Sequence, residues 1–193
     1  MIPTIFKTLH VSNLDELGEL YKNWDNYEHD VIQLAGYVGH LVTTEILLRY
    51  LDNKKAKILD AGCGTGLVGD ILYNKNYKNI VGIDFSQEML NRALKKNVYQ
   101  SLSLGDLTQK LHFEDHTFDA VICAGTFTCG HVGPEALSEM IRITKNGGYI
   151  SFTVRKQEWE ASPYEKIIKN IENSGLWIQI ERHTSEYNTQ EGI

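Results

Sequence analysis

The feature that most constrains the fold is a glycine-rich turn between two apolar runs at residues 57–70. A short apolar run precedes Gly62, Gly64 and Gly66, and apolar residues return at Leu67. Glycine lacks a Cβ and tolerates positive φ, so a ligand can lie against the bare backbone of such a turn while the next helix presents unpaired N–H groups. The stretch therefore predicts a strand, a tight turn and a helix that together hold a cofactor.

Asp60 separates two classes of cofactor. Gly64, Gly66 and Gly69 have the spacing of a dinucleotide-binding turn, but that match alone is weak. A carboxylate just before the glycines would repel the pyrophosphate of a dinucleotide. Asp60 instead favours a cofactor that carries an ammonium or sulfonium cation, and a tight turn without any ligand is the alternative.

The rest of the chain alternates apolar runs with helical patterns, which is typical of an α/β fold with a doubly wound, mostly parallel sheet. A first part, residues 1–55, is expected to form a helical cap, and residues 56–193 the cofactor-binding domain. Strands are expected at 57–61, 80–84, 98–104, 118–124, 149–154 and 176–183, with a loop at 125–131 and a turn at 144–148. Helices are expected at 13–22, 28–51, after residue 66, at 86–96, from residue 134 and at 162–174.

Acidic residues follow the second and third expected strands. Asp84 comes 22 residues after Gly62, a spacing that suits a carboxylate bonded to a ribose, although an aspartate that caps the next helix is the alternative. Phe85 and Met89 are candidates for packing on an adenine face, and for Met89 simple core packing is an equal interpretation. Asp106 is a candidate acceptor for an adenine amine or an ordinary turn aspartate.

Two further groups of side chains have weaker implications. Tyr21, Trp24 and Tyr27 form either a lid over a pocket or a staple that fixes the entry of a helix. His112 and His116 lie four residues apart in a polar segment. No nearby cysteine or third histidine completes a ligand set, so we expect no metal site.

The net charge limits the classes of partner that the chain is expected to bind, and the cysteine content indicates its compartment. The net charge of −6 over 193 residues argues against sequence-independent binding to nucleic acid, which relies on Lys and Arg contacts to phosphates. No apolar run approaches the length of a membrane span. The odd number of cysteines, Cys63, Cys123 and Cys129, indicates reduced thiols in the cytoplasm, with the nucleus as the alternative. We expect a small-molecule or protein partner, and the oligomeric state is left open.

The order of these motifs resembles the class I S-adenosylmethionine (SAM) methyltransferases over residues 56–183. The motifs are Asp60-x-Gly62-x-Gly64-x-Gly66, Asp84, Gly105-Asp106-Leu107, the run 118–124 and Thr144-Lys145-Asn146-Gly147-Gly148. Three further stretches resemble the methyltransferase-like protein 27 group: Tyr21-x-x-Trp24-x-x-Tyr27-x-x-Asp30-Val31, Cys63-Gly64-Thr65-Gly66-Leu67-Val68 and Tyr99-Gln100-x-Leu102-Ser103-Leu104.

The resemblance implies roles for individual residues. Gly62, Gly64 and Gly66 would line the methionyl part of SAM, with Asp60 at its amino group, Asp84 at the ribose, Asp106 and Leu107 at the adenine edge, and Thr126 beside the sulfonium. It also strengthens the lid interpretation of Trp24 and Tyr27. Two departures stand out: Asn146 replaces the usual proline of the turn, and one strand-like run follows the last helix. We therefore expect the final antiparallel strand to be missing and the chain to be a fragment or to have an atypical edge.

The predicted activity is methyl transfer from SAM to a small-molecule or protein acceptor. His131, after the fourth expected strand, is the candidate base, against an ordinary loop histidine. A binding or scaffold protein that holds SAM without turnover is the main alternative. A nicotinamide-dependent oxidoreductase is less favoured, because its short-chain form needs a Tyr-x-x-x-Lys pair after the fourth or fifth strand, whereas Tyr50 and Lys54 precede the first.

Overall fold

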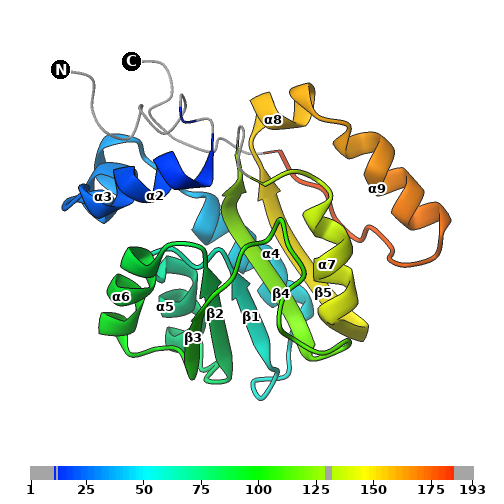
Figure 1. Cartoon of the computed structure of the whole chain (residues 1–193). Helices are drawn as coiled ribbons and strands as arrows, with labels where there is room; N and C mark the ends of the chain where they lie inside the picture. Colours follow the sequence, from blue (N-terminus) through cyan, green and yellow to red (C-terminus); the bar gives the residue numbers. More distant parts are fainter. Residues whose placement is uncertain (1–10, 12, 129–131, 185–193) are drawn as a thin grey trace.

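The protein is built on a five-stranded sheet that a computed structural model describes for residues 11, 13–128 and 132–184. The strands are β1 (Ile58–Ala61), β2 (Ile80–Asp84), β3 (Ser101–Leu104), β4 (Phe118–Phe127) and β5 (Thr144–Val154). Their order is β3-β2-β1-β4-β5 and every pair is parallel (Figure 1). The order reverses between β1 and β4, and ligands of open α/β sheets bind beyond the carboxyl ends of strands at such a point.

Helices cover both faces of the sheet. One group is α4 (Gly39–Tyr50), α5 (Leu67–Asn74) and α6 (Gln87–Lys96), and the other face carries α7 (Ala136–Ile143) and α9 (Tyr164–Asn173). The short helices α2 (Leu14–Lys22), α3 (Tyr27–His29) and the π-helix η2 (Asp30–Leu34) lie at one end of the sheet, and α8 (Lys156–Ala161) follows β5 (Figure 1). The predicted doubly wound α/β fold is confirmed.

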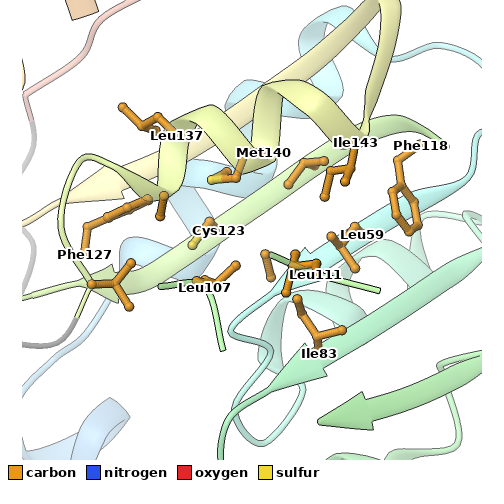
Figure 2. Packing of buried hydrophobic residues seen from close by; sticks show 14 of the residues in the cluster. Leu59, Ile83, Leu107, Leu111, Phe118, Cys123, Phe127, Leu137, Met140 and Ile143 are labelled. Atoms are coloured by element: carbon orange, nitrogen blue, oxygen red, sulfur yellow. The ribbon is translucent and has the colours of Figure 1, made fainter. Parts of the chain in front are cut away.

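Two apolar cores form because β1, β2 and most of β4 are buried on both faces. Leu137, Met140 and Ile143 of α7 pack on Leu59 and Cys123 of the sheet (Figure 2). The opposite face packs Leu47 of α4 and Leu72 of α5 on Ile58, Ile80 and Ile122. Each fully buried side chain of this size stabilises the fold by about 1.5–3 kcal/mol, so the cores fix the strand ends that surround the site.

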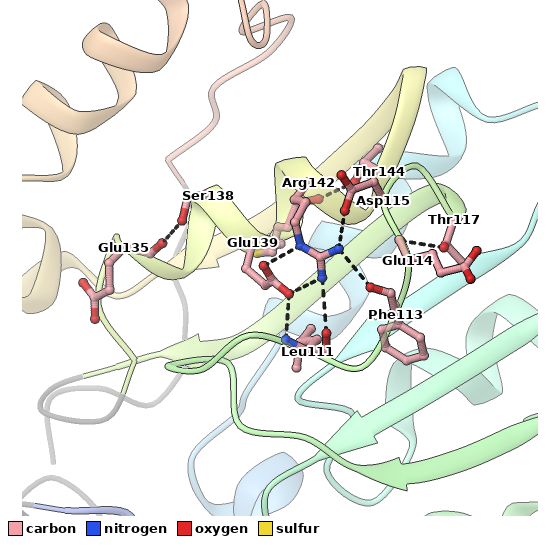
Figure 3. Close-up of polar contacts among 11 residues, drawn as sticks. Leu111, Phe113, Glu114, Asp115, Thr117, Glu135, Ser138, Glu139, Arg142 and Thr144 are labelled. Carbon is pink, nitrogen blue, oxygen red and sulfur yellow. Dashed lines mark hydrogen bonds and ion pairs between the residues drawn. The ribbon is translucent and has the colours of Figure 1, made fainter.

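Arg142 holds the connection between β3 and β4 against α7 (Figure 3). Its guanidinium donates to the carbonyl oxygens of Leu111 and Phe113 and to the carboxylates of Asp115 and Glu139. These charged partners raise the pKa of Arg142. The connection between β3 and β4, which contains His112 and His116, is thus held against α7.

The single helix predicted for residues 28–51 is wrong, because the chain breaks between η2 and α4. Gly36 has φ +66° and ends the first segment, where the Tyr37 N–H donates to the Val31 carbonyl at 3.0 Å. Gly39 then begins α4. Apolar residues recur every three or four positions on both sides of the break, so their spacing concealed it.

The predicted loop 125–131 and turn 144–148 are also corrected. β4 continues to Phe127 with a register shift against β5, and Gly125 has φ +79° at that shift. The turn residues lie within β5, where Phe118 pairs with Thr144 and Ala120 with Tyr149. The glycines therefore form irregularities within a continuous strand pair rather than its ends.

The C-terminal predictions differ most from the structure. The helix expected at 162–174 begins at Tyr164, because the Ser162 hydroxyl donates to Glu158 of α8 and does not cap α9. Gly175 (φ +72°) follows the helix end. No strand forms within residues 176–184, although they alternate in polarity. Ile178 is 85% exposed, which shows that alternation without a neighbouring strand is insufficient. No helix within the described ranges is long and apolar enough to cross a membrane.

Candidate cofactor and acceptor site

A cavity of about 230 Å³ lies at the carboxyl ends of the strands. The strand ends contribute the glycine turn after β1, Asp84 and Phe85 after β2, and Gly105–Leu107 after β3. The N-terminal helices and the connections between them cover it with apolar and aromatic side chains: Leu14, Leu17, Tyr21, Trp24, Tyr27, Val31, Ala35 and Tyr37. The cavity therefore has a polar wall from the sheet and an apolar wall from residues before β1.

The glycine turn has the bare backbone that the sequence predicts. Gly62, Gly64 and Gly66 have φ of +74°, +54° and +92°, a region that residues with a Cβ rarely adopt. A Cβ at Gly62 would also lie 2.3 Å from Thr126 Oγ1. The turn thus brings the predicted residue Thr126, from the end of β4, directly against the first glycine.

Asp84 links the glycine turn to the end of β2. Its Oδ2 accepts from the Gly64 N–H at 2.8 Å and its Oδ1 from the Ser86 N–H at 2.9 Å. Burial raises the pKa of Asp84 to about 6, although these backbone donors oppose the shift. Ser86 caps α6 by accepting from the Met89 N–H. Asp84 thus fixes the turn, lines the cavity and retains acceptor capacity for a ligand hydroxyl.

Asp60 lies deeper in the same wall and is 1% exposed. Its Oδ2 accepts from the Tyr99 hydroxyl at 2.6 Å. Burial raises the pKa of Asp60 to about 7; the Tyr99 hydrogen bond opposes this shift, and the nearby charge of Asp84 adds to it. Tyr99 comes from the segment before β3 and was not among the predicted site residues. The only sequence feature that pointed to Tyr99 was the Tyr99-Gln100 pair at the start of the third expected strand.

The predicted adenine end is assembled from three separate elements. Phe85, Met89, Asp106 and Leu107 all line the cavity, and Met89 is only 1% exposed. Asp106 Oδ1 accepts from the backbone N–H and the hydroxyl of Thr108 at 2.8 and 2.7 Å. That is the turn arrangement given as its alternative, so its role toward a nucleoside stays a prediction.

The aromatic residues Trp24 and Tyr27 also line the cavity. Their rings meet edge to face with centroids 4.9 Å apart, and Trp24 Nε1 donates to Asp30 Oδ2 at 2.8 Å. Arg92 of α6 donates to the carbonyls of Trp24 and Tyr21 at 2.7 and 3.3 Å. The end of α2 and the residues after it are thereby tied to the helix whose first turn carries Met89.

One cavity residue that the sequence analysis did not single out is His40, on the first turn of α4. The break at Gly36 brings it to the cavity, so the Gly-Tyr-Val-Gly stretch before it was the usable signal. His131, the predicted base, lies outside the described residues, as does Cys129. Within the described part of the chain, no group of three or more His, Cys, Asp or Glu side chains is arranged to hold a metal ion.

An open parallel sheet in this strand order, with glycines after the first strand and an acid after the second, is the architecture of class I methyltransferases. The family model described as "Methyltransferase domain" matches residues 59–152. Human methyltransferase-like protein 27 is 32% identical over 183 residues, which cover 91% of this chain and 70% of that protein. The chain therefore belongs to the class I SAM-dependent methyltransferases, in the group of methyltransferase-like protein 27.

Two other relatives show how far the similarity extends. Phosphatidylethanolamine N-methyltransferase of Cereibacter sphaeroides is 28% identical over 183 residues, covering 90% of this chain and 87% of that protein. A crystal structure from Methanococcus maripaludis, assigned as a SAM-dependent methyltransferase, has a TM-score of 0.56 over 80% of this chain and 74% of that chain. At 23% identity the second likeness concerns the fold alone.

Proposed function

We propose that the cavity binds SAM, with the methionyl part over the glycine turn, the ribose at Asp84 and the adenine between Phe85, Met89 and Leu107. The observation that carries this proposal is the pair of buried carboxylates, Asp60 and Asp84. Neither forms an ion pair with any residue in the described ranges, and the pKa of both is raised. A cationic ligand would relieve the cost of ionising them.

SAM supplies the reactive methyl group as a sulfonium, so the residues of the chain bind, orient and exclude water. Asp60 would favour the amino group of the methionyl part, and Thr126 would lie beside the sulfonium. Residues 1–55 would act as a cap, since Trp24, Tyr27 and Val31 supply apolar surface over the cofactor held by residues 56–193. A closed apolar cover strengthens the electrostatic contacts beneath it.

The acceptor is proposed to be a small molecule or a protein in the cytoplasm. The relatives differ in the acceptors that their names give: phosphatidylethanolamine, 18S rRNA guanine, and a lysine of eEF1A. The net charge of −6 weighs against the nucleic acid class, because counterion release requires many basic contacts. Family membership thus fixes the donor chemistry and leaves the acceptor to experiment.

Calorimetric titration with SAM, its demethylated product S-adenosylhomocysteine (SAH) and NAD tests the cofactor. We expect SAM and SAH to bind and NAD not to bind, because a pyrophosphate would face Asp60 across the glycine turn. Binding of NAD alone would overturn the proposal. Binding of SAM without release of SAH in the presence of a cell extract would instead favour a scaffold that holds the cofactor without turnover.

Asp84→Ala tests the ribose assignment. Hydrogen bonds to a charged group are worth about 1.5–3 kcal/mol each, so loss of the carboxylate is expected to weaken SAM at least tenfold. The free N–H groups of Gly64 and Ser86 are expected to lower the melting temperature without unfolding the protein. Asp70→Ala, on α5 and outside the cavity lining, is the matched control. Unchanged SAM affinity in Asp84→Ala would refute the assignment.

A further inference from the structure

Charged side chains of opposite sign line different parts of the cavity. Its acidic residues, Asp60, Asp84 and Asp106, come from the ends of β1 and β2 and from the segment after β3. Arg155, directly after β5, is partly buried and is the one lysine or arginine among the described residues that line the cavity. A guanidinium is not deprotonated in proteins, so the cavity carries a permanent positive charge on its β5 side.

The sheet order places Arg155 beyond the proposed cofactor. β5 pairs with β4 on the side away from β1, and the Arg155 N–H donates to the Phe127 carbonyl at 3.2 Å. Phe127 follows Thr126, whose side chain lies against Gly62. Because adjacent strands lie about 4.8 Å apart, β2 and β5 are separated by about 14 Å. The nucleoside would occupy the end near β2 and β3, so Arg155 lines the part of the cavity that is left for an acceptor.

Backbone contacts fix Arg155 on both sides. Its N–H bonds to Phe127 of β4, and its carbonyl accepts from the Trp159 N–H of α8 at 2.9 Å. The preceding residue, Val154, pairs with Phe127 in the sheet. The side chain therefore starts from a rigid strand end, which limits the conformational freedom that is lost when the planar guanidinium binds a ligand.

The residues at this end of the cavity select among classes of acceptor. The other described lining residues of β4 and the segment after it are uncharged: Ala124, Gly125, Thr126, Thr128 and Val132. A cationic acceptor would meet Arg155 here without any carboxylate among these residues. A carboxylate would instead accept two parallel N–H···O hydrogen bonds from the guanidinium. One guanidinium balances the single charge of a carboxylate, whereas a phosphate monoester carries about −1.5 to −2 at pH 7.

We propose that Arg155 is a specificity-determining residue and that the methyl acceptor carries a carboxylate, which this guanidinium binds. The inference rests on the proposed SAM site. Arg155 holds the carboxylate and thereby positions the acceptor atom beside Thr126, where the sulfonium methyl group is expected. The arginine itself forms and breaks no covalent bond, so its effect is on the binding and orientation of the acceptor.

The test uses the full chain saturated with SAH, so that the cofactor part of the cavity is filled and no methyl group is transferred. Butyrate is the carboxylate probe, butyramide is its neutral counterpart, butylammonium is the cation and propyl phosphate is the more highly charged anion. Affinities are measured by NMR titration at low salt, with the side-chain N–H signals of ¹⁵N-arginine-labelled protein as a second readout. Butyrate is expected to bind about tenfold more tightly than butyramide, a difference of about 1.4 kcal/mol, and to shift the Arg155 signal.

Variants show whether the preference comes from Arg155. Arg155→Met keeps the apolar stem and removes the charge, so butyrate is expected to bind no more tightly than butyramide while SAH affinity stays unchanged. Arg155→Lys keeps the charge without the planar fork and should retain part of the preference. Arg182→Met is the matched control, because Arg182 lies over the Trp159 ring, 4.2 Å from its centroid, and is not among the described residues that line the cavity.

The outcomes separate this inference from the proposed function. Equal binding of butyrate and butyramide to the wild type, tighter binding of butylammonium or propyl phosphate, or a preference that survives in Arg155→Met would overturn the inference while SAH still binds. Failure to bind SAH would overturn the proposed function itself. If Arg155→Met does not fold, Arg155→Lys and the wild-type comparison decide.

Discussion

At the scale of single residues, two carboxylates in the same cavity wall are held by different partners. Asp84 accepts from two backbone N–H groups, which replacement by alanine would leave unpaired. Asp60 accepts from the Tyr99 hydroxyl and is the more strongly shifted of the two, with its pKa at about 7. Burial raises the pKa of both carboxyls, and the charge of Asp84 raises that of Asp60 further, so the two are coupled when they titrate.

SAM affinity is therefore expected to depend on pH. The folded pKa of Asp60 is raised, so the carboxyl is protonated below about pH 7 in the free protein. A cationic ligand favours the carboxylate and lowers that pKa, so binding releases a proton from Asp60 below pH 7. Affinity should fall by up to about tenfold per unit as the pH drops from about 7 toward 6. Calorimetry in buffers of different ionisation enthalpy counts the proton.

The variant Tyr99→Phe tests whether Asp60 causes the pH dependence of SAM affinity. Loss of the hydroxyl removes the hydrogen bond that lowers the pKa of Asp60, so the fall in SAM affinity should begin at higher pH than in the wild type. The ring, which lies against Gly69 and Gly82, is kept. Identical pH profiles for the two proteins would show that Asp60 does not face the ligand's charge.

At the scale of elements, α6 connects the cofactor wall to the N-terminal segment. Its first turn carries Met89, which lines the cavity, and Arg92 donates to the carbonyls of Trp24 and Tyr21. Lys96 adds an ion pair with Glu28, with Nζ 3.0 Å from Oε1. Helix α6 and the N-terminal segment are therefore held together by side chains that lie less than two turns apart on α6.

Arg92→Met is expected to loosen the attachment of the N-terminal segment, residues 14–34, to α6. The two hydrogen bonds from the guanidinium to Trp24 and Tyr21 are lost, together with the one to Glu88 on the same helix, while the methionine keeps the apolar stem of the side chain. Amide hydrogen exchange should become faster at residues 14–34 and stay unchanged in β1, and SAM should dissociate more quickly. Lys95→Met, an exposed position on the same helix, is the control. Unaltered exchange at residues 14–34 would show that other contacts hold the segment.

The same elements show what the sequence determines. The limits of β2 and the capping of α6 by Ser86 were predictable, because an apolar run that ends in an acid and a hydroxyl before a helix are local signals. The break at Gly36 was not, since apolar residues on either side continue the same spacing. His40 was missed for that reason: its place in the cavity depends on the break and on packing against β5. The alternating run after α9 failed because pairing requires a neighbour that a pattern does not specify.

At the scale of the whole molecule, the site is a product of the sheet order. The glycine turn, Asp84 and the segment after β3 meet because β1, β2 and β3 are parallel neighbours. Thr126 joins them because β4 lies on the other side of β1. Parallel topology was predictable from alternating strands and helices, so the cofactor half of the cavity was expected. The half formed by residues before β1 depends on tertiary packing alone.

Cofactor binding is expected to stabilise the entire domain. A ligand at 100 times its Kd adds about 2.7 kcal/mol to the free energy of unfolding, and for a chain of 193 residues each kcal/mol raises the melting temperature by about 2–4 °C. SAM and SAH at that excess should therefore raise it by about 5–10 °C, and NAD should not. A scanning fluorimetry series over ligand concentration measures this. An equal rise with NAD would contradict the assigned cofactor.

The hydrogen bond between Thr43 and Ser151 spans 108 positions of the chain, and Arg92 reaches back 68 positions to Trp24. During synthesis, the N-terminal helices leave the ribosome before the strands and the helix that hold them have been made. These helices consequently find their native contacts late. Until then, nascent molecules expose the aromatic side chains of that segment to water, and chaperones that recognise apolar surface have their target there.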